Sequence, residues 1–309
     1  MSDSLRHLWR TMRPKQWVKN VFVFSAIVFA KENLLLDADA VATIVIAFLL
    51  FCLISSSVYL INDLADIEKD REHPEKRYRP LPSGALTPGM ARGAVVVLLL
   101  ICIGVIGFHV WISPDPGMGW GWFGLVGLLY FLLQLTYTFG LKHVVLFDVF
   151  AIAAGFVLRA VAGAVIISVE ITAWWILWVF FLALFLVLGK RRSELRVLKA
   201  RAGDHRPILQ EYSTTFVDYL LLIVVACTII VYSQATFTAP MAMTMSYPYL
   251  ILTTPVVVFA LFRYLFLIIQ VEQSGDIADI IFQDPPLLWT ILFWAAMVLA
   301  IKIGLMVGG

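Results

Sequence analysis

Long apolar runs divide this chain, and short polar segments separate them. A membrane-spanning helix needs about 20 mostly apolar residues. We predict nine spans, at residues 17–30, 40–61, 91–112, 120–139, 145–169, 173–189, 216–237, 247–271 and 286–307. The first is short and follows a basic arm, as in a secretory signal, but no small-residue cleavage site follows it. The predicted fold class is an all-α integral membrane protein with one domain over residues 1–309.

The composition changes this picture little. The chain is 61% hydrophobic and only 14% charged, which excludes an ordinary soluble domain and makes the lipid bilayer its solvent. Cys52, Cys102 and Cys227 lie far apart inside apolar runs, so they predict packing rather than zinc binding or a disulfide framework. We expect no nucleic-acid partner, and the sequence is compatible with a homo-oligomer.

The positions of the charges indicate the orientation. Basic residues gather in alternate connections, namely the N-terminal arm, residues 63–92, Lys142 and residues 190–206. The intervening connections hold one basic residue, Lys31. By the positive-inside rule, the N-terminus is cytoplasmic and the C-terminus, after an odd number of spans, lies outside.

An acidic cluster follows the second predicted span. If the helix continues for two more turns, Asn62, Asp66 and Asp70 share one face, and Asp63 lies beside them. Like charges at this spacing destabilise a helix unless a cation neutralises them, and carboxylate and amide oxygens suit Mg²⁺. We predict that these four residues bind Mg²⁺ and that the three aspartates are catalytic. The alternative is a solvated loop of mixed charges.

A basic stretch comes directly after the cluster. Arg71, Lys76, Arg77 and Arg79 favour an anionic ligand, because guanidinium groups pair with phosphate oxygens through both charge and geometry. Part of this charge could instead set the orientation or bind anionic lipid headgroups. Prolines and Gly84 predict a loop that can close over a substrate.

Several motifs resemble a known family. The pattern Asn-Asp-x-x-Asp-x-x-x-Asp after the second span, the nine spans and the tract from Tyr137 to Lys142 resemble the UbiA superfamily of intramembrane prenyltransferases. Segments 13–20, 62–80, 140–143 and 189–195 most resemble the decaprenyl-phosphate phosphoribosyltransferases of actinobacterial cell-wall synthesis.

This resemblance implies a UbiA-like bundle in the bacterial inner membrane, with its active site at the cytoplasmic face. The implied reaction is Mg²⁺-dependent. It joins 5-phosphoribosyl 1-diphosphate to a polyprenyl phosphate of the decaprenyl type and releases diphosphate, in arabinan precursor synthesis.

One departure from the superfamily pattern indicates the donor. Where other members carry a second Asp-rich motif after the sixth span, this chain has a basic run from Lys190 to Arg196. Such a run could bind the donor's 5-phosphate, or serve only as a positive-inside anchor. The residues that we expect to bind donor or acceptor are Lys15, Lys19, Tyr59, Asn62, Arg71, Lys76, Arg77, Arg79, Tyr137, Lys142, Arg159, Lys190, Arg191 and Glu194.

Arg159 lies inside the fifth predicted span, where a charge is costly and therefore suggests a functional site. It could bind a substrate phosphate at the bottom of a cavity, or pair with a carboxylate to hold the bundle together. Small residues at 153–155 and 160–164 predict close helix packing around it.

Three other functions remain open. A prenyltransferase could use a prenyl diphosphate donor with an aromatic or other small acceptor, but the missing second Asp-rich motif argues against it. A transporter would bury charges at mid-membrane in several helices, whereas here the charges gather on one face. A membrane scaffold is distinguished by binding neither Mg²⁺ nor a phosphorylated substrate.

Overall fold

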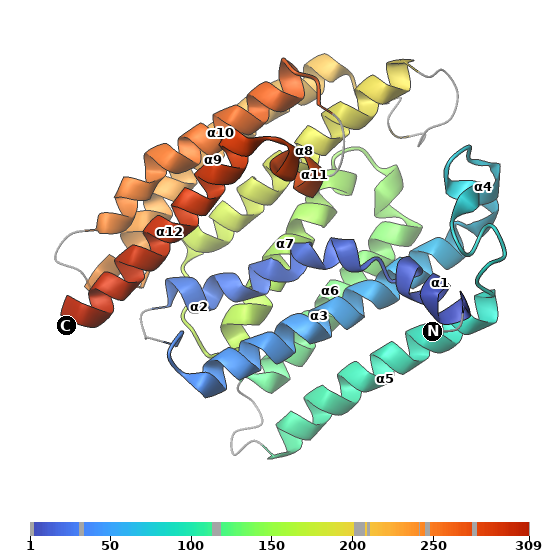
Figure 1. Cartoon of the computed structure of the whole chain (residues 1–309), viewed down its shortest axis with the longest axis horizontal. Helices are drawn as coiled ribbons and strands as arrows, with labels where there is room; N and C mark the ends of the chain where they lie inside the picture. The colour runs from blue at the N-terminus through green and yellow to red at the C-terminus, as the bar shows by residue number, and fades with distance from the viewer. Residues whose placement is uncertain are drawn as a thin grey trace. The chain divides into compact units, whose positions relative to one another are not determined.

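The computed structural model describes residues 3–30, 34–112, 119–200, 208, 211–240, 242–244, 248–273 and 277–308, and every regular element in these residues is helical (Figure 1). The chain forms two compact units. The first comprises Met1–Ile27, Ala38–Lys142 and Leu158–Val169, and the second comprises Val28–Asp37, His143–Val157 and Glu170–Gly309. The single domain over residues 1–309 stays a prediction.

The first unit is built around one long helix, α3. Its elements are α1 (Asp3–Thr11), η1 (Pro14–Phe24), α3 (Ala38–Ala65), α4 (Ile67–Glu72), η2 (Lys76–Tyr78), α5 (Pro88–Ile112), α6 (Trp120–Phe139), most of η3 (Leu141–His143) and the second part of α7 (Phe147–Ile166). Helix α3 packs against η1, α5 and α6, and 61% of its most apolar stretch is buried. The unit therefore encloses α3 and holds the polar end of this helix in a fixed place.

The second unit consists mainly of paired helices. Helix α2 (Ser25–Phe29) crosses from the first unit, and the first part of α7 precedes α8 (Ala173–Ala200), α9 (Thr214–Thr238), η5 (Ala242–Thr244), η6 (Tyr249–Thr253), α10 (Thr254–Ile269), α11 (Ile277–Gln283) and α12 (Pro285–Gly308). Helix α8 packs along α9, and α10 packs along α12. These helices are largely apolar, and an ion pair between Arg192 and Asp218 also joins α8 to α9.

Eight helical segments among the described residues are long and apolar enough to cross a membrane, so the chain is a multi-pass membrane protein. The expected first span, residues 17–30, is not among them, and the count of nine is not confirmed. This stretch instead forms the 3₁₀ helix η1 and the short α2. Within the first unit, the Val23 carbonyl oxygen takes the space that a Cβ at Gly163 would need, so small residues on α7 do permit a close approach.

Helix α8 is longer than predicted. It continues through Ala200, so the basic run from Lys190 to Arg196 lies on a helix rather than in a connecting loop. The rest of the predicted basic segment, at 201–206, lies outside the described residues, as do most of the connection at 113–119 and Lys31.

Candidate functional site

The acidic cluster lies where α3 gives way to α4. The backbone leaves helical geometry at Asp66, with φ −100° and ψ 12°. The Asp66 N–H still donates to the Asn62 carbonyl at 3.0 Å, and the Asp70 N–H donates to the Asp66 carbonyl at 2.8 Å. Helical hydrogen bonding therefore continues almost unbroken past the end of α3, as predicted. The acidic residues that share a partner are not the ones that the prediction grouped. Asp63 and Asp70, seven residues apart, meet the same arginine, whereas Asp66 contacts a lysine from another segment.

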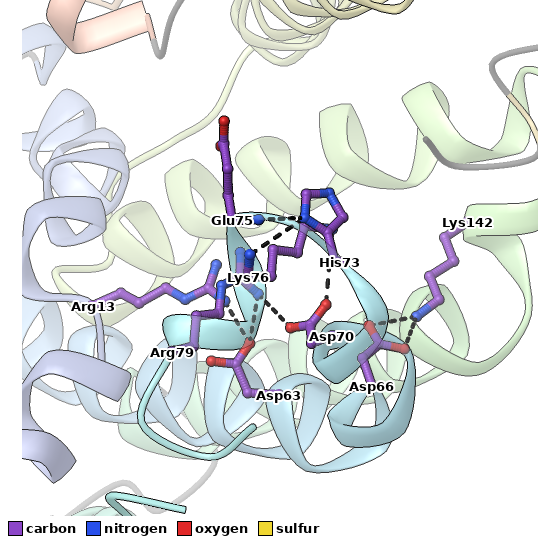
Figure 2. A network of polar contacts seen from close by, with 9 residues as sticks. All are labelled: Arg13, Asp63, Asp66, Asp70, His73, Glu75, Lys76, Arg79 and Lys142. Atoms are coloured by element: carbon purple, nitrogen blue, oxygen red, sulfur yellow. Dashed lines mark hydrogen bonds and ion pairs between the residues drawn. The ribbon is translucent and has the colours of Figure 1, made fainter. Parts of the chain in front are cut away.

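Arg79 bridges the two buried aspartates (Figure 2). Its Nη1 lies 2.8 Å from Asp70 Oδ2 and 3.5 Å from Asp63 Oδ1. Lys76 Nζ adds a longer contact of 3.9 Å to Asp70 Oδ1. Both aspartates are only 3% exposed, so these charges interact more strongly than they would in water. The structure thus brings together four residues of the predicted site.

Lys142 pairs with Asp66 through both carboxylate oxygens, at 3.0 and 3.1 Å (Figure 2). Lys142 follows the end of α6, and Asp66 follows the end of α3, so both helices end on the same side of the first unit. The positive-inside assignment requires this arrangement of the two connections, since both belong to the basic set.

Arg13 belongs to the network but was not among the predicted site residues. Its Nη2 donates to Asp63 Oδ1 at 2.5 Å. Its guanidinium carbon lies 4.9 Å from the centre of the ring of Tyr59, which is one of the predicted site residues. Arg13 has a left-handed backbone, with φ 55° and ψ 60°, directly before Pro14. Proline disfavours the right-handed helical region for the preceding residue, so α1 must end here and the side chain turns toward α3. The position of Arg13 directly before a proline that ends a helix is the sequence feature that could have identified it.

An apolar cluster fixes the backbone that carries Arg79. Leu81 and Leu86 are 2% and 1% exposed and pack with Met12 and Leu60. The Arg79 N–H donates to the Lys76 carbonyl at 2.9 Å, and the Arg79 carbonyl accepts from the N–H and the hydroxyl of Ser83. The segment after α4 is therefore anchored on both sides of Arg79. The Arg79 side chain itself is 33% exposed.

The donor chemistry of this site fits Mg²⁺. Carboxylate oxygens are the ligands that Mg²⁺ prefers, and basic side chains beside them suit a phosphate that shares the metal. Among the described residues, however, no group of three or more His, Cys, Asp or Glu side chains is arranged to hold a metal ion. Each of the three aspartates is instead paired with a basic side chain. The predicted set of metal ligands stays a prediction.

Arg71 and Arg77 lie beside this network but contact other groups. Arg71 is paired with Glu68 at 2.7 Å, and its Nε donates to the Pro82 carbonyl at 3.3 Å. Arg77 lies over the Tyr78 ring and donates to its hydroxyl at 2.7 Å. Their predicted contact with substrate stays a prediction.

The remaining predicted residues of the first unit lie on three elements. Lys15 is exposed and Lys19 is half-buried, both on η1. Asn62 near the end of α3 and Tyr137 near the end of α6 are also half-buried. All four are accessible enough to meet a ligand.

Arg159 is buried at 5% exposure within the first unit and has neutral hydrogen-bond partners there. Its Nε donates to Asn20 Oδ1 and its Nη2 donates to Tyr130 Oη, each at 2.7 Å, and it lies over the Tyr130 ring. Asn20 in turn donates to the Ser55 hydroxyl at 3.3 Å, which links η1, α3, α6 and α7. Neither the phosphate nor the carboxylate prediction for Arg159 is confirmed. Asn20 and Tyr130 were missed because nothing in their local sequence indicates the contact.

In the second unit, Arg191 is held by two carboxylates. Its Nε lies 2.9 Å from Asp148 Oδ2, and its Nη1 lies 2.6 Å from Glu194 Oε2. Tyr212 donates to Asp148 Oδ1 at 2.7 Å and accepts from the Leu146 N–H at 2.8 Å. Burial, reinforced by the hydrogen bond to Asp148, raises the pKa of the Tyr212 phenol.

Lys190, one residue before this cluster, is half-buried. The predicted contact of Lys190 and Arg191 with a donor phosphate stays a prediction. Asp148 and Tyr212 lie 64 residues apart, and neither was predicted to contact the basic run from Lys190 to Arg196.

Comparison with known proteins agrees with the fold and the motifs. A profile of the UbiA prenyltransferase family matches residues 20–283. The decaprenyl-phosphate phosphoribosyltransferase of Corynebacterium glutamicum is 37% identical over 226 residues, which cover 73% of this chain and 65% of that protein, just under two thirds. The enzyme of the same name from Mycolicibacterium smegmatis is 33% identical over 232 residues, covering 74% of this chain and 70% of that protein.

Solved structures show the same architecture. A UbiA homolog from Archaeoglobus fulgidus bound to GPP and Mg²⁺ aligns with a TM-score of 0.66 at 19% identity, over 96% of this chain and 99% of that one. The same homolog bound to DMAPP and Mg²⁺ also gives 0.66. At this identity the likeness concerns the fold alone. From the profile match, the relatives and the helical architecture together, the chain belongs to the UbiA prenyltransferase family.

Proposed function

We propose that this protein transfers 5-phosphoribose from 5-phosphoribosyl 1-diphosphate to a polyprenyl phosphate of the decaprenyl type and releases diphosphate. The observation that carries the proposal is the network in which three aspartates alternate with four basic side chains at one end of the first unit. The names of the relatives imply the same donor and acceptor. The product would serve arabinan precursor synthesis.

The aspartates are the proposed metal ligands. Asp63 and Asp70 would hold Mg²⁺, with Asp66 and Asn62 as further oxygen donors. A bound Mg²⁺ neutralises charge on a diphosphate and so makes it a better leaving group. The donor set suits this ion because Mg²⁺ takes a few carboxylates and completes its coordination with phosphate oxygens and water.

The basic side chains are the proposed phosphate ligands. Arg13, Lys76 and Arg79 would bind the diphosphate and stabilise the charge that develops on it. Lys142, with Lys15 on η1, would contact the phosphate of the lipid acceptor. This phosphate is already ionised near neutral pH, so the reaction needs no general base. An acceptor oxygen attacks C1 of the ribose, the bond from C1 to the diphosphate oxygen breaks, and the diphosphate leaves with the electron pair. In-line attack inverts C1.

We also infer that the site faces the cytoplasm. The segment after α3 and the connection after α6 meet through Asp66 and Lys142, and both belong to the basic connections of the chain. Basic connections remain on the cytoplasmic side of a membrane. The proposed donor, a water-soluble phosphorylated sugar, would then reach the site from the cytoplasm.

A donor-choice assay tests the proposal. The purified full-length protein is incubated with decaprenyl phosphate and ribose-labelled 5-phosphoribosyl 1-diphosphate, with and without Mg²⁺, and label is followed into the organic phase. We expect lipid labelling that requires Mg²⁺. No labelling from this donor, together with transfer from labelled geranyl diphosphate to an aromatic acceptor, would instead assign the protein to the ordinary prenyltransferases.

A further inference from the structure

Arg79 occupies a position between the two most buried carboxylates of the site. One nitrogen, Nη1, contacts both Asp70 and Asp63 (Figure 2). The side chains of the two aspartates are each 4% exposed, whereas the Arg79 side chain is 33% exposed. The same oxygen of Asp63 also accepts from Arg13. The oxygens that a hard cation would use are therefore already neutralised by the chain's own cations.

This arrangement sets up a competition. A metal ion that takes the oxygens of Asp63 and Asp70 that Arg79 contacts would displace its guanidinium from a partly desolvated pair, and removing one partner of such a pair leaves the other charge uncompensated. Three aspartates face four basic side chains in this network, which leaves one excess positive charge. A divalent cation alone would add to that excess. A divalent cation bound to diphosphate would not, because the diphosphate carries more negative charge than one such ion neutralises.

The fixed backbone around Arg79 leaves a change of partner to its side chain. Its backbone is held by hydrogen bonds to Lys76 and Ser83, and the following Leu81 is buried. The side chain can therefore change rotamer without moving the loop. A guanidinium released from carboxylates pairs well with phosphate oxygens, because its parallel N–H groups match them.

We propose that Arg79 competes with the metal for Asp63 and Asp70, so that metal and diphosphate bind together rather than in sequence. In the complex, Asp63 and Asp70 would hold the metal, and the Arg79 guanidinium would pair with the diphosphate oxygens. This inference rests on the proposed use of a metal-bound diphosphate. It adds that Arg79 makes the two ligands interdependent.

Metal binding, measured without turnover, tests this role. Mn²⁺ is titrated into the purified full-length protein, and free Mn²⁺ is followed by electron paramagnetic resonance, with and without inorganic pyrophosphate. We expect pyrophosphate to tighten Mn²⁺ binding to the wild type by about tenfold or more, within the usual range of coupling between two ligands. We expect Arg79→Gln to bind Mn²⁺ alone about tenfold more tightly than the wild type and to lose most of the coupling.

Arg92→Gln is the matched control, because it removes one exposed positive charge from the first turns of α5. It should leave both Mn²⁺ affinities within about twofold of the wild type, since an exposed charge at a distance is screened by salt. Equal Mn²⁺ affinity of Arg79→Gln and Arg92→Gln would overturn the role of Arg79. Equal wild-type affinity with and without pyrophosphate would also overturn it, whether or not either variant folds. Coupling without phosphoribosyl transfer would contradict the proposed function and leave this inference standing.

Discussion

The hydroxyl of Tyr212 joins two parts of the second unit, and replacing Tyr212 with phenylalanine tests what it contributes. The hydroxyl donates to Asp148, which is 0% exposed, and accepts from the N–H of Leu146, which has a left-handed backbone with φ 68°. Asp148 also faces Arg191. Tyr212→Phe keeps the ring and removes only the two hydrogen bonds.

The magnitude follows from these two contacts. A hydrogen bond to a charged group contributes about 1.5–3 kcal/mol, and leaving the half-buried N–H of Leu146 unpaired costs less than the roughly 1–3 kcal/mol of a fully buried one. Because the two share one oxygen and do not simply add, we expect a loss of about 2–4 kcal/mol. That corresponds to a fall in Tm of roughly 5–10 °C for a protein larger than 150 residues.

Thermal unfolding followed by tryptophan fluorescence in detergent measures this change. The control is Tyr219→Phe, on α9, because Tyr219 is 63% exposed and its loss should cost less than about 0.5 kcal/mol. If Arg191 binds the donor, as the sequence predicts, the KM for 5-phosphoribosyl 1-diphosphate should also rise more than the KM for the lipid, since Asp148, which faces Arg191, loses its hydrogen bond from Tyr212. A Tm for Tyr212→Phe within about 1 °C of the control would refute this reasoning.

The pH dependence provides an independent check on the same side chain. Burial raises the pKa of Tyr212 in the folded protein. A raised pKa means that its stabilisation is fully present below the unfolded value of about 10 and is lost as the pH rises through the folded value. The difference in Tm between wild type and Tyr212→Phe should therefore be the same at pH 7 and pH 9. A smaller difference in Tm at pH 9 than at pH 7 would show that the Tyr212 phenol ionises at a lower pH than its raised pKa implies.

Two further predictions concern the first unit. Asp66→Asn and Asp70→Asn should each lower Mg²⁺-dependent turnover by about a hundredfold or more, as expected for groups at or beside a metal, whereas Glu68→Gln should not, because its side chain is 84% exposed. Unchanged turnover in both folded aspartate variants would contradict the metal assignment. Glu68→Cys should react with a membrane-impermeant maleimide in inside-out vesicles and not in right-side-out ones. The opposite result would reverse the proposed orientation.

The sequence was sufficient for most of the membrane helices. Residues 91–112 and 120–139 coincide with most of α5 and all of α6, because the apolar length that a span requires is a local property. Residues 17–30 do not form such a helix. There, the polar Asn20 turns inward to Ser55 and Arg159, and these contacts depend on α3 and α7. Local apolarity could not indicate that tertiary contact.

The candidate site shows the same limit. The local sequence identified the aspartates and the basic stretch, because their density after the second span is unusual. It did not show which charges pair. Asp63 meets Arg13 across 50 positions, and Asp66 meets Lys142 across 76. Helical spacing alone grouped Asp66 with Asp70, whereas the change of direction at Asp66 leaves Asp63 and Asp70 to share Arg79.

The central claim is that the chain breaks the bond between C1 and diphosphate and joins the phosphoribose to a lipid phosphate. The most direct measurement uses a donor labelled with one isotope in the 5-phosphate and another in the diphosphate, together with decaprenyl phosphate and Mg²⁺. We predict that the 5-phosphate label enters the organic phase in equal amount to the diphosphate label released into water. Release of diphosphate without lipid labelling, or no release at all from the folded protein, would contradict the account.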